Sequence, residues 1–407
     1  MYITNNMEHT FYRISNSVIP MMLVLTIFSK ELFTWTVGGV MIDFYGYIFL
    51  GVVFLLSLPF LKINRLVLIG YVWLIISSLY MIYFHNIPLF PFLKQAIPIS
   101  FIYFGTYHIL SSYKGNLHKI FEIYIRISFY TALFGILQYF LNKIGIPILI
   151  GSSGKLDSIA YEPSHYAAII MPAVIYTLFQ YRTYKKEVIV FLFALIFTES
   201  LTSIAVLLVA LAIPRLRLLY LPLIGLFFMA AFYILPHLHV DFQKRILGTI
   251  SVIAAKDYST QTTDAGTVAS FASNLDVALY TSRQFLFTGS GLGGHETMYE
   301  RRFTGTLFEH DWFYGLNQMS AHSLSIRILS EMGLLGFLIY VLFLFKTYIK
   351  RNEMLSFHLI SLGCLSHFLC KTLKLGGYID YGTPFFFCVL ILNISLYKSY
   401  KQKLKFG

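Results

Sequence analysis

Apolar stretches alternate with short polar connections along the whole chain. Each stretch holds about 20 residues, enough for an α-helix to cross the ~30 Å hydrocarbon core of a bilayer. The pattern predicts twelve spans, near residues 16–36, 40–60, 66–84, 91–111, 119–141, 163–181, 187–198, 201–214, 218–236, 322–345, 354–372 and 381–397. The seventh and eighth spans are short, as in a re-entrant or broken pair.

The composition agrees with this pattern and excludes an ordinary soluble protein. Hydrophobic residues make up 57% of the chain and charged residues 12%, whereas about a quarter of a soluble domain is charged. The predicted fold class is therefore all-α, a polytopic integral membrane protein. It divides into a nine-span N-terminal bundle (1–236), one large loop region (237–321) and a three-span C-terminal bundle (322–407).

The basic residues predict the orientation of these spans. The net charge is +12, but the cations lie in short clusters between apolar spans, so no nucleic-acid partner is expected. The connections richest in Lys and Arg should be cytoplasmic, which puts both termini inside and the region 237–321 outside. The short connections and span ends of the outer side hold only Lys30, Lys94, Lys143, Lys155, Lys371 and Lys374.

Four polar stretches interrupt the apolar pattern, and all four fall on the predicted outer side. They are YEPSHYA (161–167), TESLTS (198–203), SRQFLFTGSGLGG (282–294) and AHSLSIR (321–327). The cytoplasmic connections, in contrast, are merely basic. This placement favours a site that faces outward.

The stretch that begins the tenth span carries three ionisable residues, His322, Arg327 and Glu331. A histidine near the bilayer surface, where water reaches it, suits proton transfer at neutral pH, or it simply caps the helix. Arg327 lies about 7.5 Å deeper. There it either forms a structural ion pair with Glu331, at i+4, or binds an anionic ligand. In one continuous helix His322 and Arg327 point about 140° apart, so they share a cavity only if it surrounds the helix or if the helix begins after His322.

Glu162 and His165 begin the sixth span at a spacing of i, i+3, which places both side chains on one helix face. Two ligands are too few for a metal site, and hydrogen bonding to a hydroxyl-rich substrate explains the pair better. Plain helix capping is the alternative, since Pro163 suits a first helical position.

The outer region offers arginines and glycines. Arg245 and Arg283 carry the planar, forked guanidinium that suits diphosphate groups. The glycine-rich GSGLGG (289–294) fits either a backbone turn around an anion or a solvated loop, and it lacks the lysine of a phosphate-binding P-loop.

Taken together, these motifs resemble those of the Wzy-type polysaccharide polymerase and O-antigen ligase superfamily. AHSLSIRILSEMGLLGFLIY resembles the family signature, in which a His, a small polar residue and a Leu precede an acidic residue and Gly-x-x-Gly. SRQFLFTGSGLGG is similar to the arginine-then-Gly-x-Gly stretch, YEPSHYA to the Glu-Pro-Ser stretch and TESLTS to the Thr-x-Ser turn. Two positions differ: Ser323 replaces the usual Asn, and Ile204 follows Ser203 where an Arg is frequent. The diphosphate-binding arginine set is therefore incompletely assigned.

The resemblance implies a GT-C-like, all-helical glycosyltransferase in the bacterial inner membrane, with its active site facing the periplasm. Such an enzyme transfers a glycan from undecaprenyl diphosphate to the non-reducing end of another lipid-linked repeat unit, for O-antigen or capsule, without metal or cofactor. Its partners would be the undecaprenyl-diphosphate-linked oligosaccharide, the lipid bilayer, a chain-length regulator and a flippase.

The candidate site residues follow from the motifs and the resemblance together. The catalytic candidates are His322, as the base for the acceptor hydroxyl, Arg327, for the leaving diphosphate, and Glu162, for sugar hydroxyls. The substrate-binding candidates are Ser164, His165, Arg245, Arg283, Gly291 and Ser323.

Two other functions fit part of the pattern. An O-antigen ligase shares the motifs but transfers the polysaccharide to lipid A core. A flippase or secondary transporter for lipid-linked oligosaccharide would instead carry charged residues near the midplane in both halves of the bundle, often with inverted repeats. Neither feature is evident in the sequence.

Overall fold

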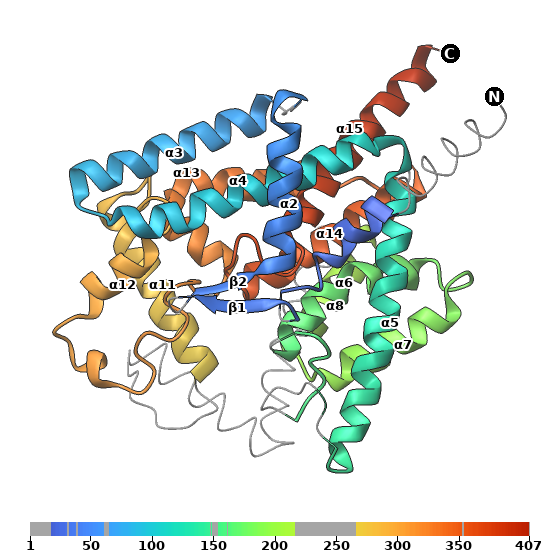
Figure 1. Ribbon diagram of the computed structural model, residues 1–407, viewed down its shortest axis with the longest axis horizontal. Helices are drawn as coiled ribbons and strands as arrows, with labels where there is room; N and C mark the ends of the chain where they lie inside the picture. The colour runs from blue at the N-terminus through green and yellow to red at the C-terminus, as the bar shows by residue number, and fades with distance from the viewer. Residues whose placement is uncertain are drawn as a thin grey trace.

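The computed structural model describes residues 18–30, 32–37, 40–60, 65–146, 148, 154–160, 162–215, 266–351 and 354–406 (Figure 1). These residues form a bundle of α-helices joined by turns and loops, with one two-stranded hairpin. The predicted ninth span and the candidate residue Arg245 lie outside the described residues.

The helices and strands follow one another in a simple order. The α-helices are α2 Phe44–Ser57, α3 Arg65–His85, α4 Leu89–Ser112, α5 Leu117–Lys143, α6 Pro163–Phe179, α7 Lys185–Phe197, α8 Leu201–Ala212, α11 Gly266–Gln284, α12 His295–Phe303, α13 Leu324–Thr347, α14 Leu355–Leu373 and α15 Thr383–Phe406. Short 3-10 helices are η1 Leu58–Phe60, η2 Lys114–Asn116, η3 Ile213–Arg215 and η6 Leu307–His310. The strands are β1 Thr34–Val37 and β2 Val40–Asp43.

Helices occupy most of the positions that the apolar pattern predicts. Among the described residues, four helices are long and apolar enough to cross a membrane: Val67–His85, Lys114–Lys143, Leu324–Thr347 and Thr383–Leu404. Shorter apolar helices are Tyr45–Ser57, Pro163–Phe179 and Leu201–Ala212. A helical protein with membrane-spanning segments is thus supported, and the described residues contain four helices of full spanning length.

The hairpin departs from the predicted all-α fold. The first span was predicted to continue to residue 36, but among the described residues its helix ends at residue 25 and β1 follows. Thr34 pairs with Asp43 and Val37 with Val40, in antiparallel register. The physical reason is that Thr, Val, Ile and Trp in TWTV and VMID suit a strand better than a helix. Asp43 then begins α2 by accepting a hydrogen bond from Gly46 N at 3.0 Å.

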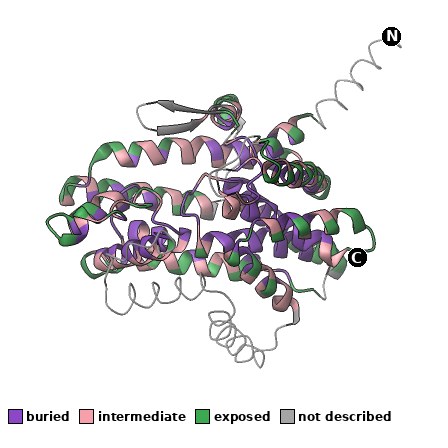
Figure 2. Cartoon of the chain, turned by 90° about the horizontal axis from the view of Figure 1, so that it is seen from below, coloured by how far each residue is buried: buried purple, intermediate pink, exposed green. Residues whose placement is uncertain are grey.

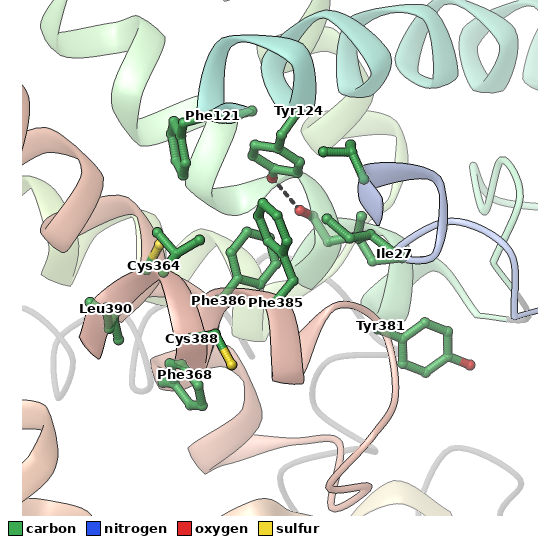
Figure 3. Close-up of a cluster of buried hydrophobic side chains, with 14 of the residues drawn as sticks. Ile27, Phe121, Tyr124, Cys364, Phe368, Tyr381, Phe385, Phe386, Cys388 and Leu390 are labelled. Carbon is green, nitrogen blue, oxygen red and sulfur yellow. Dashed lines mark hydrogen bonds between the residues drawn. The ribbon is translucent and has the colours of Figure 1, made fainter. Parts of the chain in front are cut away.

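The core lies where α5, α6, α14 and α15 meet, and Figure 2 shows the buried residues concentrated inside the bundle. Gly363 of α14 approaches α6 so closely that a Cβ there would lie 2.9 Å from Pro172 O. Tyr124 of α5 donates a hydrogen bond to Ile169 O at 2.5 Å, above the rings of Phe385 and Phe386 (Figure 3). These contacts hold the four helices closely together.

The outer surface of α3 is apolar. Ile69, Ile76 and Tyr83 recur every seven residues on one face and are 64%, 61% and 79% exposed. In water such a stripe would be a costly exposed patch, whereas lipid tails match it. The surface of α3 is therefore that of a lipid-facing helix.

Candidate functional site

Chain segments far apart in the sequence meet at one end of the bundle. The end of α14 touches the start of α6, where Lys374 Nζ lies 3.0 Å from Glu162 Oε2. It also touches the residue pair before α13, because Leu375 N donates to His322 O at 2.8 Å. We call the gathered side chains the charged cluster; its members are Lys30, Glu162, His165, His322, Lys371, Lys374 and Asp380. Two of the predicted outer stretches, YEPSHYA and AHSLSIR, therefore meet.

His322 precedes α13 instead of lying within it. His322 has a φ of 60° and Ala321 a φ of 56°, in the left-handed region that non-glycine residues rarely occupy. Ser323 then caps the helix, since Ile326 N donates to Ser323 Oγ at 3.3 Å. The helix thus begins after His322, which is one of the two arrangements that would let His322 and Arg327 share surroundings. The predicted substrate-binding residue Ser323 serves as this cap.

The His322 side chain is enclosed. It is 5% exposed, so the expectation of a water-accessible histidine was wrong. The ring packs edge to face with Phe271, at a centroid distance of 5.7 Å. Nδ1 lies 3.0 Å from Ser270 Oγ, while Nε2 has no hydrogen-bond partner within the described part of the chain. Burial and the Lys374 cation lower the pKa of His322 to about 4, against the opposing effect of Glu162. At neutral pH the ring is therefore uncharged.

The Glu162 carboxylate contacts three side chains instead of capping its helix. Its Oε2 accepts hydrogen bonds from Lys374 Nζ at 3.0 Å and from Ser164 Oγ at 3.2 Å, and His165 Nε2 lies 3.7 Å away. Burial raises the pKa of the carboxyl, but Lys374 and His165 lower it more, so the net shift is downward. Glu162 occupies the N-cap position of α6, with Pro163 after it, but its side chain makes no cap hydrogen bond, so capping does not account for the carboxylate.

His165 lies on the inner side of the same turn. Its ring centroid is 4.5 Å from that of Tyr381, and its Nδ1 is buried without a hydrogen-bond partner. The pairing of Glu162 with His165 at i, i+3 is thus confirmed in the structure, together with Ser164. All three predicted residues belong to one group around Lys374.

The predicted ion pair between Arg327 and Glu331 is present, with Nε 3.2 Å from Oε1. Arg327 Nη1 also donates to Gly376 O at 3.2 Å, and the guanidinium lies 4.5 Å from the Tyr378 ring centroid. Tyr378 in turn donates its hydroxyl to Glu331 Oε2 at 2.8 Å. Of the guanidinium nitrogens only Nη2 is buried without a partner. Arg327 therefore fastens α13 to the loop between α14 and α15, and its charge is largely neutralised.

That loop, residues 374–382, and two lysines packed against it are the part of the cluster that sequence reasoning missed. Lys371 donates to Gly377 O from the last turn of α14. Lys30, from the chain before β1, lies 2.5 Å from Asp380 Oδ1. Burial raises the pKa of Asp380, but Lys30 and Lys371 lower it further, to about 2. A signal was available: Lys30, Lys371 and Lys374 all come from the predicted outer side, where cations are scarce.

Arg283, predicted to bind diphosphate, is exposed in the last turn of α11. Ser270, which contacts His322, lies thirteen residues earlier on the same helix, about 20 Å away along its axis. The structure therefore does not bring Arg283 to the charged cluster.

The glycine-rich stretch binds protein groups. Gly333 breaks α13 with a φ of 65° and a ψ of −170°, which frees carbonyl groups of the preceding turn. Ser290 N donates to Ser330 O at 2.8 Å, Gly291 N to Glu331 O at 2.9 Å, and Leu334 N to Leu286 O at 2.7 Å. Within a membrane, such a break is tolerated only where other protein groups satisfy it. Because the Gly291 N–H is used here, the anion-turn interpretation was wrong, and residues 286–291 repair the break.

Within the described residues, no three His, Cys, Asp or Glu side chains gather in a way that could hold a metal ion. No protein-family model matches the chain, and neither does any curated protein. The chemistry of the charged cluster is therefore argued from its own residues.

Proposed function

We propose that this protein is a polysaccharide polymerase, a metal-independent membrane glycosyltransferase whose active site is the charged cluster. The observation that carries the proposal is a buried, uncharged histidine with a free Nε2, next to the Lys374–Glu162 pair. The proposal includes a twelve-span, GT-C-like architecture in the bacterial inner membrane. It also places both termini in the cytoplasm and the cluster at the periplasmic face.

The proposed reaction needs a base for the acceptor hydroxyl and cations for the leaving diphosphate. The acceptor sugar hydroxyl loses its proton to His322 Nε2, and its oxygen bonds to the anomeric carbon of the donor glycan. The bond from that carbon to the lipid diphosphate breaks, and its electron pair leaves with the diphosphate. General-base help of this kind contributes about 10²–10⁴ in rate. A neutral imidazole is the form that accepts a proton.

The anion-binding role moves from the arginines to the lysines of the cluster. Arg327 already holds Glu331 and Gly376 O, and Arg283 lies far along α11. Lys374 is partly exposed, at 24%, so it is the cation best placed to meet a diphosphate oxygen and stabilise its charge. Glu162 and His165 then orient sugar hydroxyls. The lipid diphosphate is an activated donor, so no nucleotide sugar is needed.

Products in cells separate this proposal from a ligase and from a flippase. The test uses cells that make the lipid-linked repeat unit and lack the wild-type protein. Cells that carry the His322→Ala variant should have single repeat units on the final glycolipid, while the wild-type protein restores polymer. The exposed His310 provides a matched control, and His310→Ala should support full polymer. Loss of a ligase would instead leave polymer on its lipid carrier. Loss of a flippase would trap repeat units on the cytoplasmic face. Either of these results would contradict the proposal.

A further inference from the structure

Ser270 of α11 contacts His322 across 52 positions of sequence and is completely buried. Its Oγ has three polar neighbours: His322 Nδ1 at 3.0 Å, Asn317 Nδ2 at 2.9 Å and Leu316 O at 3.2 Å. The Asn317 amide can only donate and the Leu316 carbonyl can only accept. The role of His322 Nδ1 depends on where the single hydroxyl proton of Ser270 points.

Counting hydrogen bonds resolves the choice. If the Ser270 hydroxyl donates to Leu316 O, its oxygen accepts from Asn317 and from a protonated His322 Nδ1, and all three contacts are satisfied. If the hydroxyl donates to Nδ1 instead, the contact with Leu316 O is lost. The ring proton would then lie on Nε2, which has no hydrogen-bond partner among the described residues. The first arrangement satisfies one more contact and uses the ring N–H inside the protein, so it is favoured.

A second buried histidine holds this arrangement in place. Asn274, one turn after Ser270 on α11, donates its amide to Ser270 O at 2.6 Å and to Leu316 O at 3.1 Å. Its Oδ1 must therefore accept from His295 Nε2 at 2.9 Å, and His295 Nδ1 accepts from Ser330 Oγ at 2.8 Å. Burial lowers the pKa of His295 to about 3, so this ring too is neutral. α11, α12 and α13 are thus joined around Ser270 by polar groups whose directions are fixed.

We propose that Ser270 is a positioning residue that holds His322 in the Nδ1–H tautomer, so that the Nε2 lone pair is free to take the acceptor proton. The role in turnover rests on the proposed glycosyltransferase function, whereas the tautomer itself does not. Here a neutral serine does what an orienting carboxylate does beside other catalytic histidines. It fixes which ring nitrogen carries the proton. The charged groups that face His322 are Lys374 of α14 and Glu162 of α6.

The tautomer can be measured directly by solid-state NMR on the whole protein in lipid bilayers, with ¹⁵N-labelled histidine at pH 7. The His322 signals are identified as those that disappear in His322→Gln. Wild type should show a protonated Nδ1 and an unprotonated Nε2. Ser270→Ala should shift His322 toward the Nε2–H form, and Ser270→Thr, which keeps the hydroxyl, should retain the wild-type tautomer. Ser273→Ala is the control, because Ser273 is also buried on α11 and its hydroxyl bonds to Ser270 O, at 3.3 Å.

Polymerisation by the same variants tests the link to catalysis. Ser270→Ala should lower kcat about tenfold, the value of one lost neutral hydrogen bond, while Ser270→Thr and Ser273→Ala stay near wild type. An Nε2–H tautomer in wild type, or one unchanged by Ser270→Ala, would overturn the assignment. So would a tautomer shift in Ser270→Ala without loss of kcat. A wild-type protein that shows the Nδ1–H form but makes no polymer would instead refute the proposed function and leave the tautomer standing.

Discussion

His322 lies near a charged pair, formed by Lys374 at the end of α14 and Glu162 at the start of α6. Burial is the largest cause of its lowered pKa, and the two charges act on it in opposite directions. A neighbouring cation disfavours the protonated imidazole, whereas a neighbouring anion favours it. The charged pair therefore sets the fraction of His322 that stays unprotonated, and able to act as a base, at acidic pH.

Two substitutions should move the pKa of His322 in opposite directions. Lys374→Met removes the cation and should raise this pKa from about 4 toward 6.5, because the protonated form is no longer repelled. Glu162→Gln removes the anion and should lower it. The acid side of the pH–kcat/KM profile reports this pKa. It should move to higher pH in Lys374→Met and to lower pH in Glu162→Gln. A shift of both variants in the same direction would contradict the placement of these charges.

Among single residues, the sequence predicted contacts within one helix and missed contacts between distant segments. The i, i+3 and i, i+4 spacings predicted the Glu162–His165 and Arg327–Glu331 pairs, because such contacts are local to one helix. The contact between Lys374 and Glu162 joins residues 212 positions apart, and that between His322 and Ser270 spans 52. No periodicity encodes such contacts; they depend on how the helix ends meet.

At the scale of elements, α13 is two helical pieces joined at Gly333. The φ of 65° at this residue is accessible to glycine at little cost. A Cβ there would lie 2.7 Å from Phe287 O, in the segment that repairs the break. The kink therefore depends both on the conformation of one glycine and on the close approach of residues 286–291.

Gly333→Ala should destabilise the protein. The strained backbone alone costs about 1–3 kcal/mol, and the close contact adds to it. Gly70→Ala is the matched control on a described helix: a Cβ there meets nothing within 4 Å, and the replacement should gain about 0.5–1 kcal/mol of helix stability. The free energy of unfolding in detergent, from denaturant titration, measures both. Equal stability of the two variants would show that the break does not need glycine.

The apolar stretches predicted the positions of several helices but not the hairpin or the break within α13. The predicted spans at 66–84 and 91–111 correspond to α3 and α4. The same apolar character concealed the hairpin at Thr34–Asp43, since β-branched and aromatic residues suit both a buried helix and a strand. It also concealed the break in α13, because Gly333 reads as an ordinary small residue of a packed helix.

For the whole molecule, the arrangement of helix ends is the feature that matters for function. The start of α6, the end of α14, the residues before α13 and the chain around Lys30 converge on one end of the bundle. The predicted topology puts all four on the outer side of the membrane. The proposed site thus forms only when both terminal parts of the chain pack together, consistent with the close packing of α6 against α14.

The most direct test of the central claim, that the charged cluster transfers glycans, uses purified protein in detergent or bilayers with a lipid-diphosphate-linked repeat unit. Chain length is followed by gel for the wild type, for His322→Ala and for His310→Ala, each checked for folding. A product ladder is expected from wild type and His310→Ala, with the rate in His322→Ala lower by about 10²–10⁴. A folded wild-type protein that makes no ladder, or a ladder that persists unchanged in His322→Ala, would contradict the account.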